Sequence, residues 1–238
     1  MADPHASEDR FVALVLQIVT WAQRNTRGLV LGIGAAAILV FAVKYYVDFK
    51  QRVHVAAATE MLNLRYQLQT GTPDQVIEQL RAYLLQFSGT SYAREARVLL
   101  AHSLLLSNRA AEAIEPARQA MDDLGDDVLS LRAAFLAAAA YEEVGDTTAA
   151  IDVYREIGRR TDFRVQKSRA LEAAARLLSA RGDAAAAAAI YDELAEITPE
   201  AAPARPYYEM RAAELRAKEA AILATQELGT GESGTEGG

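Results

Sequence analysis

The sequence contains no cysteine, only 6 prolines and 14 glycines, and 7% aromatic residues. The lack of cysteine excludes a disulfide scaffold, a cysteine-ligated zinc site and a cysteine nucleophile. With so little glycine and proline, the chain is neither collagen-like nor of low complexity. What is present, 51% hydrophobic and 24% charged residues over 238 positions, has the balance of a folded protein with one or two domains.

Motifs that would carry chemistry are also missing. The three histidines, His5, His54 and His102, are isolated, so no pair has the spacing of a helical metal site. There is no glycine-rich phosphate loop and no Gly-x-Ser-x-Gly nucleophile elbow. We therefore expect a protein that is not an enzyme, with no catalytic residue, no metal, no cofactor and no small-molecule substrate.

The charge is unevenly distributed. The formal net charge is −7, and the residues after Arg52 hold 19 basic against 28 acidic side chains. Binding of nucleic acid needs a basic surface. The acidic body therefore argues against a nucleic-acid partner.

One long hydrophobic run stands near the start. Residues 28–43 read GLVLGIGAAAILVFAV without a charge, and extension to residue 47 adds only Lys44, Tyr45, Tyr46 and Val47. Twenty helical residues span about 30 Å, the hydrocarbon thickness of a bilayer. The lysine can snorkel and the tyrosines suit the membrane interface. We expect residues 28–47 to cross the membrane in contact with lipid. A buried core helix and a cleaved signal peptide are the alternatives, but a 27-residue leader precedes the run and bulky tyrosines follow it.

The N-terminal segment, residues 1–27, contains a possible amphipathic helix at 11–23. Phe11, Val15, Ile18 and Ala22 have helical spacing there. Such a helix would lie on the membrane surface or against a partner subunit. Three basic residues precede the hydrophobic run and three follow it up to Arg52, so the charge rule does not choose an orientation.

After Arg52 the pattern is helical, and turn residues recur at a fixed interval. Gly71, Asn108, Gly145 and Gly182 are each 37 residues apart. Glycine and asparagine are favoured where a helix ends in the left-handed conformation. Thr72, Asp146 and Asp183 follow as expected N-caps, Pro73 suits a first helical position, and Pro116 should bend or delay its helix.

The positions around each turn repeat as well. Five residues after it come Val76, Ala113, Ala150 and Ala187, all small enough for two helices to cross closely. The segment YEEVGDTTAAIDVYREI at 141–157 resembles a tetratricopeptide repeat, which is a pair of helices. The expected fold class is all-α, with one transmembrane helix before a tetratricopeptide-like solenoid of about four helix pairs over residues 48–205. A capping helix over 206–228 and a disordered tail over 229–238 complete this plan.

Such a solenoid presents a concave face, lined mainly by the first helix of each pair, that binds segments of other proteins. Four arginines there could form a basic strip that clamps a carboxylate. Ordinary solvated helix faces are the alternative. By analogy with tetratricopeptide arrays, the candidate partner-binding residues are Met61, Arg65, Glu95, Val98, His102, Arg132, Phe135, Arg169 and Arg176.

The layout as a whole resembles the ancillary Sec-translocon subunit family of bacteria. The matching features are FVALVLQIVTWAQRNTRG, then LVLGIGAAAILVFAVKYYVDFKQ, then alanine-rich helices leading into repeats, up to about residue 200. The resemblance implies a single-pass protein of the inner membrane, with a cytoplasmic N-terminus and a periplasmic repeat domain. It also implies contact with Sec translocon subunits and with a periplasmic chaperone or folding factor. A scaffold in another envelope complex (cytochrome maturation, cell division or envelope assembly) would need the same features, and a receptor facing the cytosol would follow from the reverse topology.

Overall fold

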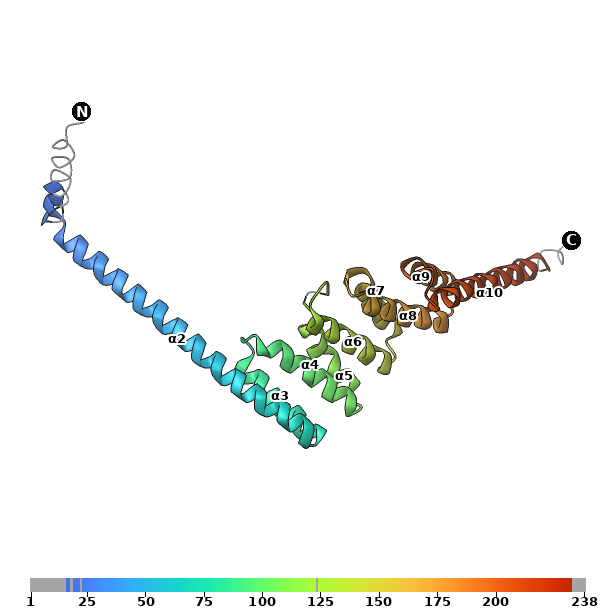
Figure 1. Ribbon diagram of the computed structural model, residues 1–238, viewed down its shortest axis with the longest axis horizontal. Helices are drawn as coiled ribbons and strands as arrows, with labels where there is room; N and C mark the ends of the chain where they lie inside the picture. Colours follow the sequence, from blue (N-terminus) through green and yellow to red (C-terminus); the bar gives the residue numbers. More distant parts are fainter. Residues whose placement is uncertain (1–15, 18, 22, 123, 233–238) are drawn as a thin grey trace, which may run out of the picture. The chain divides into compact units, whose positions relative to one another are not determined.

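The computed structural model describes residues 16–17, 19–21, 23–122 and 124–232, and these contain helices but no β-strand (Figure 1). The chain divides into two units, Met1–Ala56 and Ala57–Gly238, and the division lies inside helix α2. The helices are α2 (Thr26–Thr70), α3 (Pro73–Phe87), α4 (Tyr92–Leu106), α5 (Ala110–Ala120), α6 (Val128–Glu143), α7 (Thr147–Arg160), α8 (Arg164–Arg181), α9 (Ala184–Ile197) and α10 (Ala204–Glu232).

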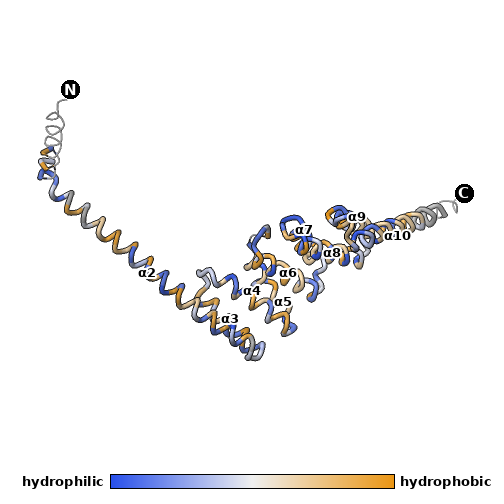
Figure 2. Tube along the Cα trace, in the orientation of Figure 1, coloured by the Kyte–Doolittle hydropathy of each residue, from blue (hydrophilic) through white to orange (hydrophobic). Residues whose placement is uncertain are grey.

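The first unit is dominated by the hydrophobic start of α2. Within this helix, Thr26–Leu68 is the one stretch in the described residues long and apolar enough to cross a membrane. Figure 2 shows hydrophobic residues along its first half, and large side chains such as Ile38 and Phe41 are exposed. The helix continues without a break to Thr70, and residues 35–70 contain neither glycine nor proline. Of the segment before it, residues 16–17, 19–21 and 23–24 are helical. The amphipathic positions Phe11, Val15, Ile18 and Ala22 lie outside the described residues, as does His5.

The second unit is built from helix pairs, each joined at one of the four repeated turn residues. We call the first helix of each pair an A helix (α2 from Ala57, α4, α6, α8) and the second a B helix (α3, α5, α7, α9). Every B helix begins two residues after the turn residue. Asn108, Gly145 and Gly182 have positive φ angles of 56°, 83° and 95°, which confirms the left-handed helix ends. Gly71 differs: a Cβ there would lie 2.9 Å from the Gln67 carbonyl oxygen, so close approach of the backbone requires this glycine.

The expected helix starts are confirmed in part. The Asp146 carboxylate accepts a hydrogen bond from the Ala149 N–H at 3.0 Å, as an N-cap should. Asp183 occupies the N-cap position of α9, but its carboxylate binds the Arg181 guanidinium (Nε–Oδ2 2.7 Å) instead of the helix backbone. At α3, Pro73 is the first helical residue, and the Thr72 N–H donates to Gln75 Oε1 at 3.4 Å.

The expected delay of the helix by Pro116 is wrong. The residue lies inside α5, which begins in register with the other B helices. What distinguishes α5 is its end at Ala120, three residues earlier than α7 and α9 end in the 37-residue register. The chain between α5 and α6 is correspondingly longer.

The core follows the same period. Ala101, Ala138, Ala175 and Ala212 stand 37 residues apart on successive A helices, and all four are completely buried. Their small methyl groups let neighbouring helices approach closely. In the B helices, Leu80, Tyr154 and Tyr191 at one shared position and Ile157 and Leu194 at another fill the space between pairs. From Leu124 to Leu215 most of the buried residues of α6 to α10 form one cluster, and Val98, Ala120 and Ala133 form another nearer the start of the array.

Helix α10 continues this pattern beyond the four pairs. Its buried residues Tyr208, Ala212 and Leu215 correspond to Leu171, Ala175 and Leu178 in α8. Thus α10, which packs on α9, occupies the A-helix position of a fifth unit. It is helical to Glu232, so the expectation of disorder was wrong for residues 229–232, and residues 233–238 lie outside the described part.

A polar cluster fixes the longer connection between α5 and α6. Ser130 is completely buried; its hydroxyl donates to Asp127 Oδ2 at 3.0 Å and accepts from the Asp122 N–H at 3.2 Å. Arg94 of α4 pairs with the same Asp127 at 2.7 Å. Burial alone would raise the pKa of the Asp127 carboxyl, but hydrogen bonds from Leu129 and Ser130 and the charge of Arg94 outweigh it and lower the pKa. The carboxylate therefore stays ionised and organises the start of α6.

Replacement of Ser130 by alanine should lower the free energy of unfolding by about 2 kcal/mol, because it leaves the partly buried Asp122 N–H and part of the Asp127 carboxylate without their partner. Urea denaturation followed by circular dichroism measures the difference. The control is Ser168→Ala, on a half-buried serine with no side-chain hydrogen bond in the described structure. A variant of Ser130 as stable as the control would show that the cluster does not hold this connection.

Candidate functional site

Successive A helices are connected by polar side chains that point across their shared face. Arg65 of α2 binds Glu95 of α4 (Nε–Oε1 2.8 Å), and Arg176 of α8 binds Glu142 of α6 at 2.6 Å. Further along, the Tyr208 hydroxyl of α10 donates to Glu172 of α8. We call the surface formed by these helices the A-helix face. Its polar groups stabilise the stacking of repeats as well as facing solvent.

The predicted basic strip is thereby divided. Two of its members, Arg65 and Arg176, are already paired with carboxylates. The Arg169 guanidinium lies over the Phe135 ring, 4.9 Å from its centroid, and this ring also contacts Tyr154. Arg132 forms no ion pair with any described residue. The strip is thus not a row of four free cations, and only Arg132 and Arg169 lack a carboxylate.

Two candidate residues are core residues in this structure. Met61 and Val98 are each only 1% exposed. Met61 belongs to the inward-facing stripe of α2 with Ala57 and Leu64, and Val98 packs with Ala120 and Ala133. Neither side chain is available to a partner, so their place among the candidates is corrected. The physical reason is that an A helix packs against more than one other helix. The buried stripe on it is therefore wider than the repeat pattern of the sequence indicates.

His102 and Arg132 lie together at the other end of the array from α10. Both line a pocket of about 280 Å³ between α2, α3, α4 and α6. The pKa of His102 is lowered, first by burial and second by the positive charge of Arg132. The imidazole is therefore neutral at pH 7 and its environment favours an anion.

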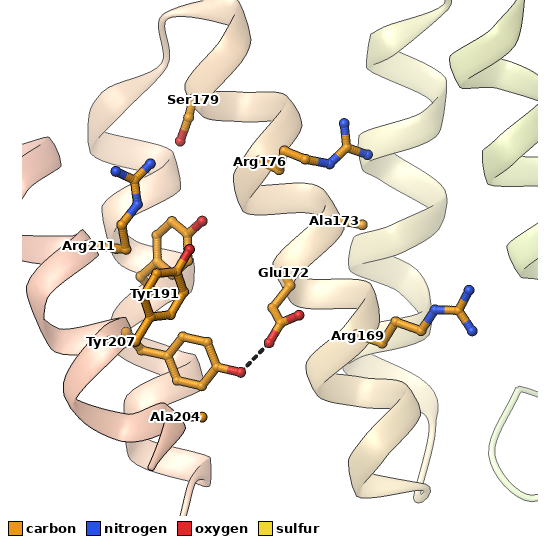
Figure 3. A pocket seen from close by; sticks show the side chains of 10 residues that line it. Arg169, Glu172, Ala173, Arg176, Ser179, Tyr191, Ala204, Tyr207 and Arg211 are labelled. Carbon is orange, nitrogen blue, oxygen red and sulfur yellow. Dashed lines mark hydrogen bonds between the residues drawn. The ribbon is translucent and has the colours of Figure 1, made fainter.

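A larger groove lies between α8, α9 and α10. It consists of two adjoining hollows of about 600 and 810 Å³ that share Arg169, Glu172, Ala204 and Tyr208. We call it the C-terminal groove. Figure 3 shows Glu172 pointing from α8 toward the tyrosines, and Tyr207 and Arg211 lying on α10. Arg169 and Arg176 also line the groove, but their side chains extend from α8 on its other side, toward α6. Arg164 and Lys167 of α8 line the second hollow.

Three tyrosines form an aromatic cluster in this groove. The ring centroids of Tyr191, Tyr207 and Tyr208 lie 5.7 to 6.4 Å apart, and the Arg211 guanidinium is 5.8 Å from the Tyr191 ring. Burial raises the pKa of Tyr191, and burial together with the bond to Glu172 raises the pKa of Tyr208. Both hydroxyls therefore stay protonated, and that of Tyr208 donates a hydrogen bond to Glu172.

The groups that line the C-terminal groove suit the binding of another protein. In the described residues no cluster of three or more histidine, aspartate or glutamate side chains could hold a metal ion. What the C-terminal groove offers is aromatic surface next to guanidinium groups. Tyrosine and arginine are the residue types enriched where proteins bind one another tightly.

The tyrosines and Arg211 were missed by the sequence interpretation, which placed the last repeat before residue 205. The missed residues are Glu172, Tyr191, Tyr207, Tyr208 and Arg211. A signal was available, because Ala212 continues the series Ala101, Ala138 and Ala175 at the same spacing. Extension of the 37-residue register by one more repeat would have predicted that α10 is an A helix. It would also have placed the first turn of α10 on the A-helix face.

Replacement of Tyr208 by phenylalanine should lower the free energy of unfolding by about 1 kcal/mol, because it removes a hydrogen bond to a carboxylate that is partly screened by water. Urea denaturation measures this, with Tyr66→Phe on an exposed ring as control. If Tyr208→Phe were as stable as the control, the contact between α10 and α8 would not contribute to stability.

Comparison with known proteins supports the fold. No family model matches the sequence, and no curated protein matches it. Among solved structures, the nearly identical TPR-like repeats of a kinesin light chain-like protein from Podosopora anserina superpose with a TM-score of 0.50 at 15% identity, over 72% of this chain and 90% of that one. Its Q17M variant gives the same values. At this identity the likeness concerns the fold: the described solenoid is tetratricopeptide-like, as the sequence predicted.

Proposed function

We propose that this chain is a membrane-anchored, non-enzymatic protein-interaction module that binds segments of partner proteins on its A-helix face. The observation that carries the proposal is the C-terminal groove, where a tyrosine cluster and several guanidinium groups line an open surface. Repeat solenoids commonly act as interaction scaffolds, since stacked units create an extended binding surface.

The shape and chemistry of the groove favour a peptide segment over a small molecule. Its two hollows adjoin along α8, and their combined extent exceeds what one or two side chains would fill. Exposed Tyr207 offers a flat apolar surface, while Arg169 offers a donor with no carboxylate partner. A segment with an apolar or aromatic residue near an acidic one would satisfy both.

The hydrophobic start of α2 supports attachment to a membrane. It is long enough to cross the bilayer, and its side chains find no burial within the described structure. Since a buried core helix would be covered by other helices, its exposure favours contact with lipid over that alternative.

The resemblance in layout narrows the proposal further. We propose a subunit associated with the Sec translocon, with a cytoplasmic N-terminus and a periplasmic repeat domain, that links secreted chains to a periplasmic chaperone or folding factor. A scaffold in another envelope complex is the alternative, because it would use the same anchor and groove. A reporter that is active only in the periplasm, fused after Leu228, tests the orientation: its inactivity would exclude the periplasmic assignment.

Affinity purification of the full chain from its own membranes in a gentle detergent tests the function. We expect translocon subunits and a periplasmic folding factor to co-purify with the wild type and to be reduced with Arg169→Ala in the groove. Arg155→Ala is the matched control, because this arginine is exposed on the B helix α7 and pairs with no described residue. Enrichment of another complex would favour the scaffold alternative, and recovery of no partner would contradict the interaction function itself.

A further inference from the structure

The pair His102 and Arg132 breaks a pattern that the preceding repeat sets. Arg65 and Glu95 form an ion pair between α2 and α4. Thirty-seven residues later, the same two positions hold His102 on α4 and Arg132 on α6. The acid has been replaced by an arginine, so two basic groups face each other where the preceding repeat places opposite charges. The interaction between them is unfavourable, as the lowered pKa of His102 indicates.

These two groups stand at the edge of an apolar hollow. The walls of the pocket of about 280 Å³ come from Leu68, Val76, Leu99 and Leu106. Among the described residues that line it, His102 and Arg132 are the ones that ionise. A hollow of this size lies just below the range of about 300–1,000 Å³ typical of drug-sized ligands. It therefore suits one or two side chains rather than a cofactor.

The charged groups of the surrounding helices are engaged elsewhere. Arg65 of α2 forms an ion pair with Glu95 of α4, and Arg94 of α4 forms one with Asp127. On α3 and α5, Asp74, Glu78 and Glu112 form a separate network with Arg81 and Arg109. Glu115 of α5 accepts a hydrogen bond from Gln119. No described carboxylate pairs with Arg132. The positive charge at the pocket is thus left for a group from outside the described fold.

We propose that this pocket binds an acidic side chain and the apolar residue next to it in a partner protein, and that His102 takes up a proton when the carboxylate binds. The apolar residue would enter between Leu68, Val76 and Leu99, while the carboxylate accepts hydrogen bonds from Arg132 and from the protonated imidazole. The pocket lies between three A helices and the start of the B helix α3. A segment bound along the A helices would run across several repeats, so an internal segment suits the pocket better than a chain end. The inference rests on the proposed function and adds the chemistry of one part of the partner.

Proton uptake makes the binding dependent on pH with a defined sign. A carboxylate beside His102 raises the pKa of the imidazole, because it stabilises the charged form. Binding is then tighter below the pKa of His102 in the free protein and weakens as the pH rises through its pKa in the complex. A carboxylate that contacted Arg132 alone would show no such change between pH 5 and pH 8.

Nuclear magnetic resonance of the three histidines tests the proposal in the full chain, held in lipid nanodiscs. The probe is N-acetyl-Glu-Leu-amide, and its neutral match is N-acetyl-Gln-Leu-amide. We expect the first to bind with a dissociation constant of about 1 mM, to shift the His102 resonances selectively and to raise the pKa of His102 by about 1. The glutamine peptide should do neither. Arg132→Gln should weaken binding about tenfold or more.

Controls separate the possible failures. Arg169→Gln changes the equivalent position one repeat further along and should leave this binding unchanged. Arg132→Lys, which keeps the charge, should retain part of the affinity and shows whether a loss in Arg132→Gln reflects charge. Equal binding of both peptides, or no response of His102 to either, would overturn the proposal. Selective binding of N-acetyl-leucine with its free carboxylate would overturn the assignment to an internal segment. None of these results would affect partner recovery through the C-terminal groove.

Discussion

Replacement of Leu194 by alanine is expected to lower the free energy of unfolding by about 3 kcal/mol. The side chain is completely buried in α9, at the core position that Ile157 holds in α7. It contributes to the interface between the last two repeats, and its removal leaves a cavity that closely spaced alanine-rich helices have little freedom to fill. Denaturation by guanidinium chloride, followed by circular dichroism, gives the change.

The effect of Leu194→Ala should also be local. In a repeat array each unit contacts mainly its neighbours, so loss of one core residue weakens the adjacent pairs first. Hydrogen exchange measured by mass spectrometry should increase in α8, α9 and α10 and remain near wild type in α4 and α5. Leu85→Ala is the control, because this leucine is 87% exposed and its loss should change stability by less than about 0.5 kcal/mol. A uniform increase in exchange would contradict a stack of units stabilised by their neighbours.

The double substitution Leu31→Arg and Ile38→Arg is expected to move the protein from the membrane to the soluble fraction. Each arginine near the centre of a membrane helix costs about 2.5–3.5 kcal/mol for insertion. Both side chains are exposed in the first unit, so the change removes no packing within the described structure. The fraction of protein that remains with carbonate-washed membranes is the measurement.

Leu62→Arg is the matched control for this change. It introduces the same side chain at an exposed leucine of the same helix α2, but in the second unit. The variant should stay with the membrane. If the double variant stayed as well, α2 would not be the anchor, and attachment would depend on another part of the chain.

Much of the fold could be predicted, because the signals that set it are local. A glycine or asparagine ended each A helix, and the position of the B helix followed from it. The uncharged run at the start of α2 could be recognised as long enough to cross a membrane from its length alone. Pro116 was misjudged, since its effect depends on how the whole B helix packs: α5 is held in register by buried Ala113 and Ala117.

The candidate site was less predictable, because its properties depend on contacts between distant helices. The sequence identified Arg65 and Arg176 as basic residues of the A helices, but their carboxylate partners are 30 and 34 residues away. To predict that Met61 and Val98 are buried, one would have to know both of the helices that pack against each of them. Whether His102 and Arg132 face each other likewise depends on the offset between α4 and α6. The 37-residue register predicts such pairings only when it is also known which face each helix turns toward its neighbour.

The central claim is that partners bind on the A-helix face, and photo-crosslinking in intact membranes tests it most directly. A photoreactive amino acid at Ala173, which lines the C-terminal groove, is compared with the same residue at Arg155 on the B helix α7. We expect crosslinks to discrete protein partners from position 173, lost when Arg169→Ala is added, and few from position 155. Crosslinks that arise equally from both positions, or only from position 155, would contradict it.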